Sequence, residues 1–246
     1  MNNFLQADWP APGNIRALVT LRSGGVSEAC YASLNPALHV GDDPDAVLVN
    51  RRKIREMLQL PAEPVWLEQV HGCRVVEAKT GMPLPQADAS FTRQADVVCT
   101  VMSADCLPLL LCNRQGSCIA AVHGGWRGLL AGVVENTVKA MGEQQLLAWL
   151  GPAIGPSCFE VGEEVRSAFV EKSADFVPAF QARENGRWLA DIYHIARIIL
   201  GQLQIDAVYG GDCCTFSDPR RFYSYRRDGR TGRMAALIWM LSGADS

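Results

Sequence analysis

Short apolar runs alternate with polar and glycine-containing segments along most of the chain. The runs are rich in Val, Ile, Leu and aromatic residues, a length and composition typical of buried β-strands. They predict strands at 17–21, 65–70, 74–78, 97–102, 107–112, 118–123, 146–150 and 235–241.

Other segments carry apolar residues at helical spacing. The clearest follows GDDP, where Asp43 can cap a helix and Pro44 suits its first position. Val47, Ile54 and Leu58 then fall on one face. Further helices are expected at 129–141, 163–170 and 190–203.

Strands and helices mix without strict β-α-β alternation, and no repeat or linker marks a boundary. We therefore expect an α+β fold, a single compact domain over 1–246 with mixed β-sheets flanked by helices.

Composition narrows the functional classes. The chain has 246 residues, is 48% hydrophobic and carries a formal net charge of -3, so it lacks the basic field that attracts nucleic acid. No apolar stretch reaches the roughly 20 residues that cross a bilayer, and MNNFLQADWPAPG does not resemble a signal peptide. The nine cysteines are an odd number scattered through apolar runs. We expect reduced thiols in a cytoplasmic protein with no nucleic-acid or membrane partner.

The segment ADCLPLLLCNRQGSCIAAVHGGWRG, residues 104–128, carries the candidate chemistry. Cys106 starts one apolar run and His123 ends the next. The NRQGS connection would make the two runs antiparallel neighbours, which places both side chains at the same edge of a sheet. The glycine-rich turn after His123 opens a helix whose N-terminal amides attract anions, and Arg127 adds a bidentate donor.

A third chemical group is available from EQVHG, where His71 follows the strand predicted at 65–70. Two histidines and a cysteine at strand ends would suit a zinc site with an open fourth position. Wide separation of the ligands in sequence is more usual for catalytic metals than for zinc fingers. The alternative is that Cys106 is a small buried hydrophobe.

Five motifs in order make the chain recognisable: VWLEQVHG, ADCLPLLLCN, AAVHGGWRG, WLGPAIGPSCFEVG and FYSYRRDGRTGRM. Together they resemble the YfiH family, also called laccase-domain or peptidoglycan-editing-factor proteins, which includes the FAMIN-type purine nucleoside enzymes. The resemblance implies that His71, Cys106 and His123 hold zinc. It also implies a fold similar to a deamidating toxin domain that uses a Cys-His pair. One departure is Gly124, where the family commonly has alanine, and it removes no functional group.

The resemblance further implies phosphorolysis of adenosine, inosine and methylthioadenosine, and deamination of adenosine. For deamination, zinc would lower the pKa of water for attack at C6, and Asp105 is our candidate to shuttle the proton. Phosphorolysis needs phosphate held against C1′, a task suited to arginine. The substrate-binding candidates are Arg22, Arg127, Arg226 and Arg227, with Asn35, Gln69 and Ser224 to orient ribose or phosphate. Each arginine has the plain alternative of a surface salt bridge. The expected partners are a nucleoside and phosphate, and we expect a monomer.

A second hypothesis is a cysteine hydrolase, with Cys106 as nucleophile, His123 as base and the helix amides as oxyanion hole. The peptidoglycan-editing name fits amide cleavage on muramyl precursors, which a zinc site could also perform. His71 separates the two hypotheses in part, because a dyad needs no second histidine.

Two further hypotheses are a copper-dependent polyphenol oxidase and a binding protein without catalysis. The chain has only four histidines (His39, His71, His123 and His194), too few for a multicopper cluster. A lone copper ion could bind at His71, Cys106 and His123, because copper(II) outranks zinc at such ligands. We interpret copper oxidation at this site as adventitious. The remaining conspicuous residues fit structural roles: Asp42 and Asp88 in turns or caps, and Cys213 and Cys214 in packing. Trp126 could stack on a base, but we expect it to fill the core, and the turn that carries Cys158 is expected to be structural and outside the site.

Overall fold

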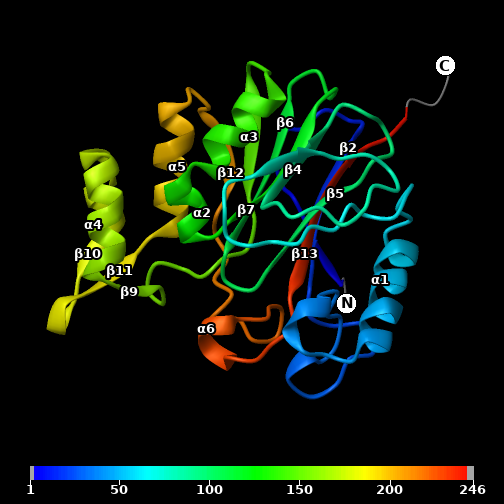
Figure 1. The fold of residues 1–246 in the computed structure, drawn as a ribbon, viewed down its shortest axis with the longest axis horizontal. Helices are drawn as coiled ribbons and strands as arrows, with labels where there is room; N and C mark the ends of the chain where they lie inside the picture. The colour runs from blue at the N-terminus through cyan, green and yellow to red at the C-terminus, as the bar shows by residue number, and fades with distance from the viewer. Residues whose placement is uncertain (1–2, 243–246) are drawn as a thin grey trace.

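A six-stranded mixed sheet holds the two predicted strands that flank Cys106 and His123 (Figure 1). In this computed structural model, which describes residues 3–242, its strand order is β12-β8-β6-β7-β4-β3. Its strands are Val75–Glu77 (β3), Ala89–Thr92 (β4), Leu107–Asn113 (β6), Ile119–Gly124 (β7), Leu146–Leu150 (β8) and Ala207–Gly210 (β12).

A four-stranded antiparallel sheet packs against one face of the larger sheet. Its order is β1-β2-β13-β5, with strands Phe4–Gln6 (β1), Ile15–Thr20 (β2), Cys99–Ser103 (β5) and Met234–Met240 (β13). Alternate residues of β6 face opposite sides: Leu110 joins the core between the sheets, whereas Leu109 joins the core under the helices. Because both faces of β6 and β7 are covered, these strands are buried throughout.

Helices cover the two outer faces of this pair of sheets. Trp126–Ala131 (α2), Val133–Met141 (α3) and Ile192–Gln202 (α5) pack on the six-stranded sheet, and Pro44–Met57 (α1) packs on the four-stranded sheet. Glu163–Lys172 (α4) lies at one end of the molecule with a small sheet (Figure 1), whose strands are Glu160–Gly162 (β9), Phe180–Ala182 (β10) and Arg187–Ala190 (β11). Shorter helical segments are Ala29–Tyr31, Leu38–Val40, Ala174–Ala179, Glu184–Gly186 and Tyr225–Asp228 (α6). Within residues 3–242, no helix has the length and hydropathy to cross a bilayer.

The predicted α+β fold with mixed sheets and flanking helices is confirmed. The α1 helix begins at Pro44, and the Asp43 carboxylate accepts a hydrogen bond from the Asp45 amide at 3.1 Å, as its cap motif predicts. One predicted strand is wrong: residues 65–70 form only isolated bridges, at Val65 and Glu68. Its backbone bonds first to Val98 and then to the 85–87 segment, so no single strand pairs along its length.

The helix predicted at 129–141 is two helices, because Gly132 interrupts it. Gly132 has φ of +90° and serves both as the C-cap of α2 and as the N-cap of α3. The apolar periodicity runs through the break, since Leu129, Val133 and Val134 are all buried. A hydrophobic pattern alone therefore did not mark this turn, whereas a left-handed backbone favours glycine.

Replacing Gly132 by alanine should lower the free energy of unfolding by about 1–2 kcal/mol, because the new Cβ would occupy a left-handed conformation. The cost comes from the backbone alone, since the nearest atom to that Cβ would be 3.7 Å away. The measurement is chemical denaturation. The matched control is Gly201→Ala in α5, which has open space and a helical backbone, and should keep or raise stability. Equal effects of the two substitutions on the free energy of unfolding would contradict the left-handed backbone conformation assigned to Gly132.

Candidate active site

His71, Cys106 and His123 meet at one edge of the six-stranded sheet. The antiparallel register of β6 and β7 pairs Pro108 with His123, so Cys106, just before β6, lies beside the end of β7. The candidate ligand atoms of the three residues all lie within 4.8 Å of one another, and Cys106 Sγ is 3.8 Å from His71 Nε2. The structure therefore brings together the three residues that strand-end reasoning grouped.

Asp88 fixes both histidine segments from beneath. Its fully buried carboxylate accepts hydrogen bonds from the backbone amides of Val70 (3.2 Å), His71 (2.9 Å) and Gly72 (2.7 Å). The same carboxylate lies 2.9 Å from Nδ1 of His123. These bonds hold His71 in a left-handed conformation, with φ of +59°. Because Nδ1 of His123 bonds to Asp88, Nε2 is the ring nitrogen of His123 that remains for the cluster.

The second glycine of GGWRG gives the crowded cluster room. A Cβ on Gly125 would lie 3.0 Å from Cδ2 of His71 and 3.1 Å from Sγ of Cys106. The preceding Gly124 has a packing reason instead, because its Cβ would lie 2.8 Å from the carbonyl oxygen of Leu107. An alanine at 124 would therefore need a shift of the β6 backbone.

The cluster is strongly polarised. Burial by itself would raise the pKa of the Cys106 thiol, but the charge of His123 and hydrogen bonds from both histidines lower that pKa to about 6. Burial would likewise lower the pKa of His123, yet Cys106 and Asp88 raise it to about 9. Burial opposes the charge of Asp88 too, but hydrogen bonds from His123 and the Gly72 amide hold its pKa below the usual range. Thiolate is the form of cysteine that binds metals and attacks electrophiles.

A cavity of about 560 Å³ opens beside the cluster. Of the residues singled out from sequence, it is lined by His71, Cys106, His123, Asp105, Gln69, Trp126, Arg127 and Arg226. Trp126, for which a core role was expected, is half-buried at the cavity wall. The wall also includes His39, Tyr225 and Arg233, which sequence reasoning missed. Arg233 lies within the RRDGRTGRM motif, but that motif contains four arginines and nothing in it ranks them.

Three arginines from separate segments share this cavity. Arg127 at the start of α2 is exposed and stacks on Trp126, with its guanidinium carbon 4.3 Å from the ring centroid. Arg226 on α6 is exposed and donates to the carbonyl of Glu160 at 2.8 Å. Arg233 is half-buried, and burial lowers its pKa. The cavity therefore offers several guanidinium donors opposite the cluster.

Two cavity residues have both of their side-chain polar atoms hydrogen-bonded. Asp105 accepts from Thr215 Oγ1 at 2.6 Å and from the Arg226 amide at 2.7 Å, so both of its carboxylate oxygens are engaged. Gln69 exchanges two hydrogen bonds with the backbone of Met102, at 2.7 and 2.8 Å. Both contacts position the cavity wall.

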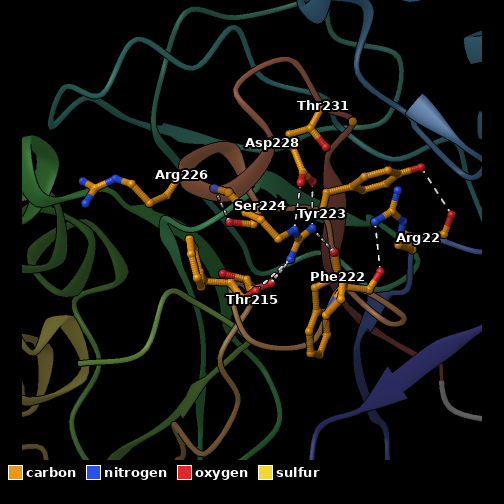
Figure 2. Close-up of polar contacts among 12 residues, drawn as sticks. Arg22, Thr215, Phe222, Tyr223, Ser224, Arg226, Asp228 and Thr231 are labelled. Atoms are coloured by element: carbon orange, nitrogen blue, oxygen red, sulfur yellow. Dashed lines mark hydrogen bonds and ion pairs between the residues drawn. The ribbon is translucent and has the colours of Figure 1, made fainter. Parts of the chain in front are cut away.

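Four predicted substrate-binding residues do not line the cavity: Arg22, Asn35, Ser224 and Arg227. Each of them is hydrogen-bonded to the protein's own backbone instead, and Figure 2 shows Arg22 and Ser224 among these contacts. Arg22 donates to the carbonyls of Ala32 and Pro219. The Arg227 guanidinium donates to backbone carbonyls, including those of Thr215 and Phe222, and pairs with Asp228. Ser224 caps α6, and Asn35 accepts from the Arg233 amide at 3.0 Å.

The donor set fits a metal ion. Two imidazoles and a low-pKa thiolate converge, one imidazole bonds to a buried carboxylate, and the cluster faces a cavity. Carboxylate–histidine pairs of this kind orient ligating imidazoles, and three protein ligands leave a position for substrate or water. The same residues in the order Cys106, His123 and Asp88 also form the hydrogen-bonded sequence of a nucleophile, a base and an orienting acid.

Known proteins resemble the chain over almost its whole length. A family model described as "Multi-copper polyphenol oxidoreductase laccase" matches residues 16–241. A protein of Pseudomonas aeruginosa named purine nucleoside phosphorylase is 56% identical, with 98% of this chain and 99% of that protein covered. Purine nucleoside phosphorylase YfiH of Escherichia coli is 48% identical, with 98% and 100% covered.

Solved structures share the fold. A crystal structure of a Neisseria meningitidis protein superposes with a TM-score of 0.95 at 47% identity, covering 98% of this chain and all of that one. YlmD from Geobacillus stearothermophilus has a TM-score of 0.92 at 29% identity, with 98% and 97% covered. The chain therefore belongs to the YfiH family, whose model carries the multi-copper polyphenol oxidoreductase laccase name.

Proposed function

We propose that this protein is a zinc-dependent purine nucleoside phosphorylase acting on adenosine, inosine and methylthioadenosine, with adenosine deaminase activity. The observation that carries the proposal is the shared cavity, where the His71–Cys106–His123 cluster and three arginines line one space. The names of the relatives at 48% and 56% identity support the same reaction class. A volume of about 560 Å³ falls in the range of small-molecule sites.

The arginines supply the phosphate site of this proposal. Phosphorolysis requires a phosphate oxygen to reach C1′ as the bond to the purine breaks. Arg127, Arg226 and Arg233 present charged donors from different segments, which suits the tetrahedral array of phosphate oxygens. Ile154, Phe159 and Ile192 give the same cavity an apolar wall for the purine.

The three ligands supply the metal site. His71, Cys106 and His123 would hold zinc, which when bound acts as a Lewis acid and lowers the pKa of water. Asp88 accepts a hydrogen bond from Nδ1 of His123 and so leaves Nε2 for the cluster. Copper at these ligands would be adventitious, and His194 on α5 lies outside the cavity lining.

Deamination at C6 of adenosine would use the same cavity. Asp105, which adjoins Cys106 in sequence and lines the cavity, remains the candidate proton shuttle. Its bonds to Thr215 and the Arg226 amide also give it a positioning role, because they fix α6 beside the cluster.

A second candidate function is favoured by the polarised Cys106–His123 pair. With Asp88 behind His123, this pair suits a cysteine hydrolase that cleaves amides in muramyl precursors. In this alternative Cys106 is a nucleophile rather than a ligand.

The Cys106→Ala variant separates the two candidates. We expect about one zinc per chain in the wild type, and loss of both zinc and phosphorolysis in the variant. The measurements are elemental analysis and an assay with adenosine plus phosphate. Cys30→Ala, at a half-buried thiol outside the cavity lining, should keep both. Activity retained in metal-free wild type, and abolished when Cys106 is alkylated, would move the assignment to the hydrolase.

Asp88→Asn should weaken metal binding by about 10–100-fold. The amide removes the negative charge that orients His123, and its nitrogen cannot accept the hydrogen bonds that one carboxylate oxygen accepts from this part of the chain. Competition with a chelator of known affinity measures this. Asp43→Asn is the matched control, since asparagine caps a helix as well as aspartate does. Unchanged metal affinity in Asp88→Asn would contradict the orienting role.

Replacing Arg226 or Arg233 with glutamine should raise the KM for phosphate by about 10–100-fold, since a hydrogen bond to a charged group contributes about 1.5–3 kcal/mol. Initial rates at varied phosphate with saturating nucleoside give this value. The control is Arg114→Gln in the exposed turn between β6 and β7, which should leave the KM unchanged. If the Arg226 and Arg233 variants both keep the wild-type KM, phosphate does not bind at these two arginines.

A further inference from the structure

A second group of thiols lies outside the cluster and takes no part in the proposed reaction. Cys158 ends the GPAIGPSC turn, and Cys213 and Cys214 lie in GGDCCTF, all three half-buried. Ser217 joins two of them: its Oγ lies 3.4 Å from Sγ of Cys158 and 3.2 Å from Sγ of Cys214. Two thiols far apart in sequence thus share one hydroxyl neighbour.

The backbone fixes the two loops that carry these thiols. The Thr215 amide donates to the carbonyl of Ala153 at 2.9 Å, and Ala153 forms a bridge with Cys214. The Gly155 amide donates to Sγ of Cys214 at 3.2 Å. A Cβ on Gly155 would lie only 3.1 Å from that sulfur, so glycine at this position eases the close approach. The position of Cys214 against the 153–158 loop is therefore built into the fold.

The surroundings favour the thiolate at one of the two vicinal cysteines. Burial raises the pKa of a thiol, but hydrogen bonds from Ser217, the Gly155 amide and Cys158 outweigh it and lower the pKa of Cys214 below its usual value. At Cys213, by contrast, burial and the charge of Asp212 raise the pKa to about 11. Peroxides oxidise thiolates and not thiols.

We propose that Cys158 and Cys214 are a peroxide-sensitive dithiol that closes to a reversible disulfide. The Cys214 thiolate attacks one oxygen of hydrogen peroxide, so an S–O bond forms, the O–O bond breaks and hydroxide leaves. The Cys158 thiol gives up its proton and attacks the resulting sulfenic sulfur, the S–S bond forms, and the S–O oxygen leaves as water. The two sulfurs lose two electrons, which the peroxide takes up.

The disulfide would join two loops that shape the cavity. Ile154 and Phe159, on either side of the 155–158 turn, line the cavity, and Thr215 bonds to Asp105. The proposal rests on the contacts between the loops and does not depend on the reaction assigned to the cavity.

The test is peroxide treatment of the zinc-supplemented full-length protein, followed by blocking of free thiols and a non-reducing peptide map. We expect one cross-linked peptide joining Cys158 to Cys214, removed by dithiothreitol. Its formation should be at least ~10-fold faster than oxidation of Cys30, which lacks these hydrogen bonds. In Cys158→Ser, Cys214 should stop at a sulfenic acid that dimedone traps. In Cys214→Ser, neither product should form at these positions.

The wild-type map stands even if a serine variant fails to fold, which thermal unfolding would reveal. Cys30→Ser is the matched control and should give the wild-type cross-link. Repeating the reaction in Cys106→Ala removes the competing thiolate of the cluster and should also leave the cross-link unchanged. A cross-link between Cys213 and Cys214, a cross-link that requires Cys106, or reduced Cys158 and Cys214 after treatment would each overturn the proposal.

Discussion

The buried carboxylate of Asp88 ties together two segments that share no strand pairing at the site. It accepts the amides of the 70–72 turn on one side and faces Nδ1 of His123 on the other. A buried charge is costly unless it is fully hydrogen-bonded, and Asp88 meets this condition only with both segments in place. The geometry of the cluster is therefore set as the protein folds. The orientation of His71 is fixed by its bonds to Asp88 as well as by the conformation of the 70–72 turn.

Strand register and close packing also fix the geometry of the cluster. The β6–β7 register fixes where Cys106 and His123 emerge from the sheet, and Gly125 lets the chain pass beside both His71 and Cys106. The cavity wall opposite is held by a different set of bonds, from Asp105 to α6 and from Arg227 to the 215–222 segment. These contacts keep the arginines and the cluster on one cavity, as the proposed phosphorolysis requires.

One arrangement of Cys, His and Asp satisfies two chemistries because both need the same electrostatics. A metal ligand and a nucleophile each require a thiolate, and His123 and His71 stabilise that thiolate at Cys106. His71 is the residue that favours metal binding, since a nucleophile with one base has no use for a second imidazole. The polarised Cys106–His123 pair is therefore common to both proposed chemistries.

Local sequence was sufficient where one pattern corresponds to one structure. The Asp43–Pro44 cap, the β6–β7 hairpin and the meeting of Cys106 with His123 follow from spacing, because antiparallel pairing has a fixed geometry. His71 was grouped with them because it follows the apolar run at 65–70, although that run forms only isolated bridges in the structure. Asp88 is different, since its role depends on partners 16 to 35 residues away and nothing in ADAS distinguishes it from a turn residue.

The arginines show the limit most clearly. Sequence named Arg22, Arg127, Arg226 and Arg227, but only tertiary packing separated Arg127 and Arg226, which line the cavity, from Arg22 and Arg227, whose guanidinium groups bond to backbone carbonyls. The same packing added Arg233 and His39 to the cavity. Composition and spacing determine which residues are charged and which elements they occupy. Which way a long side chain points is decided by the acceptors around it, and these come from segments distant in the chain.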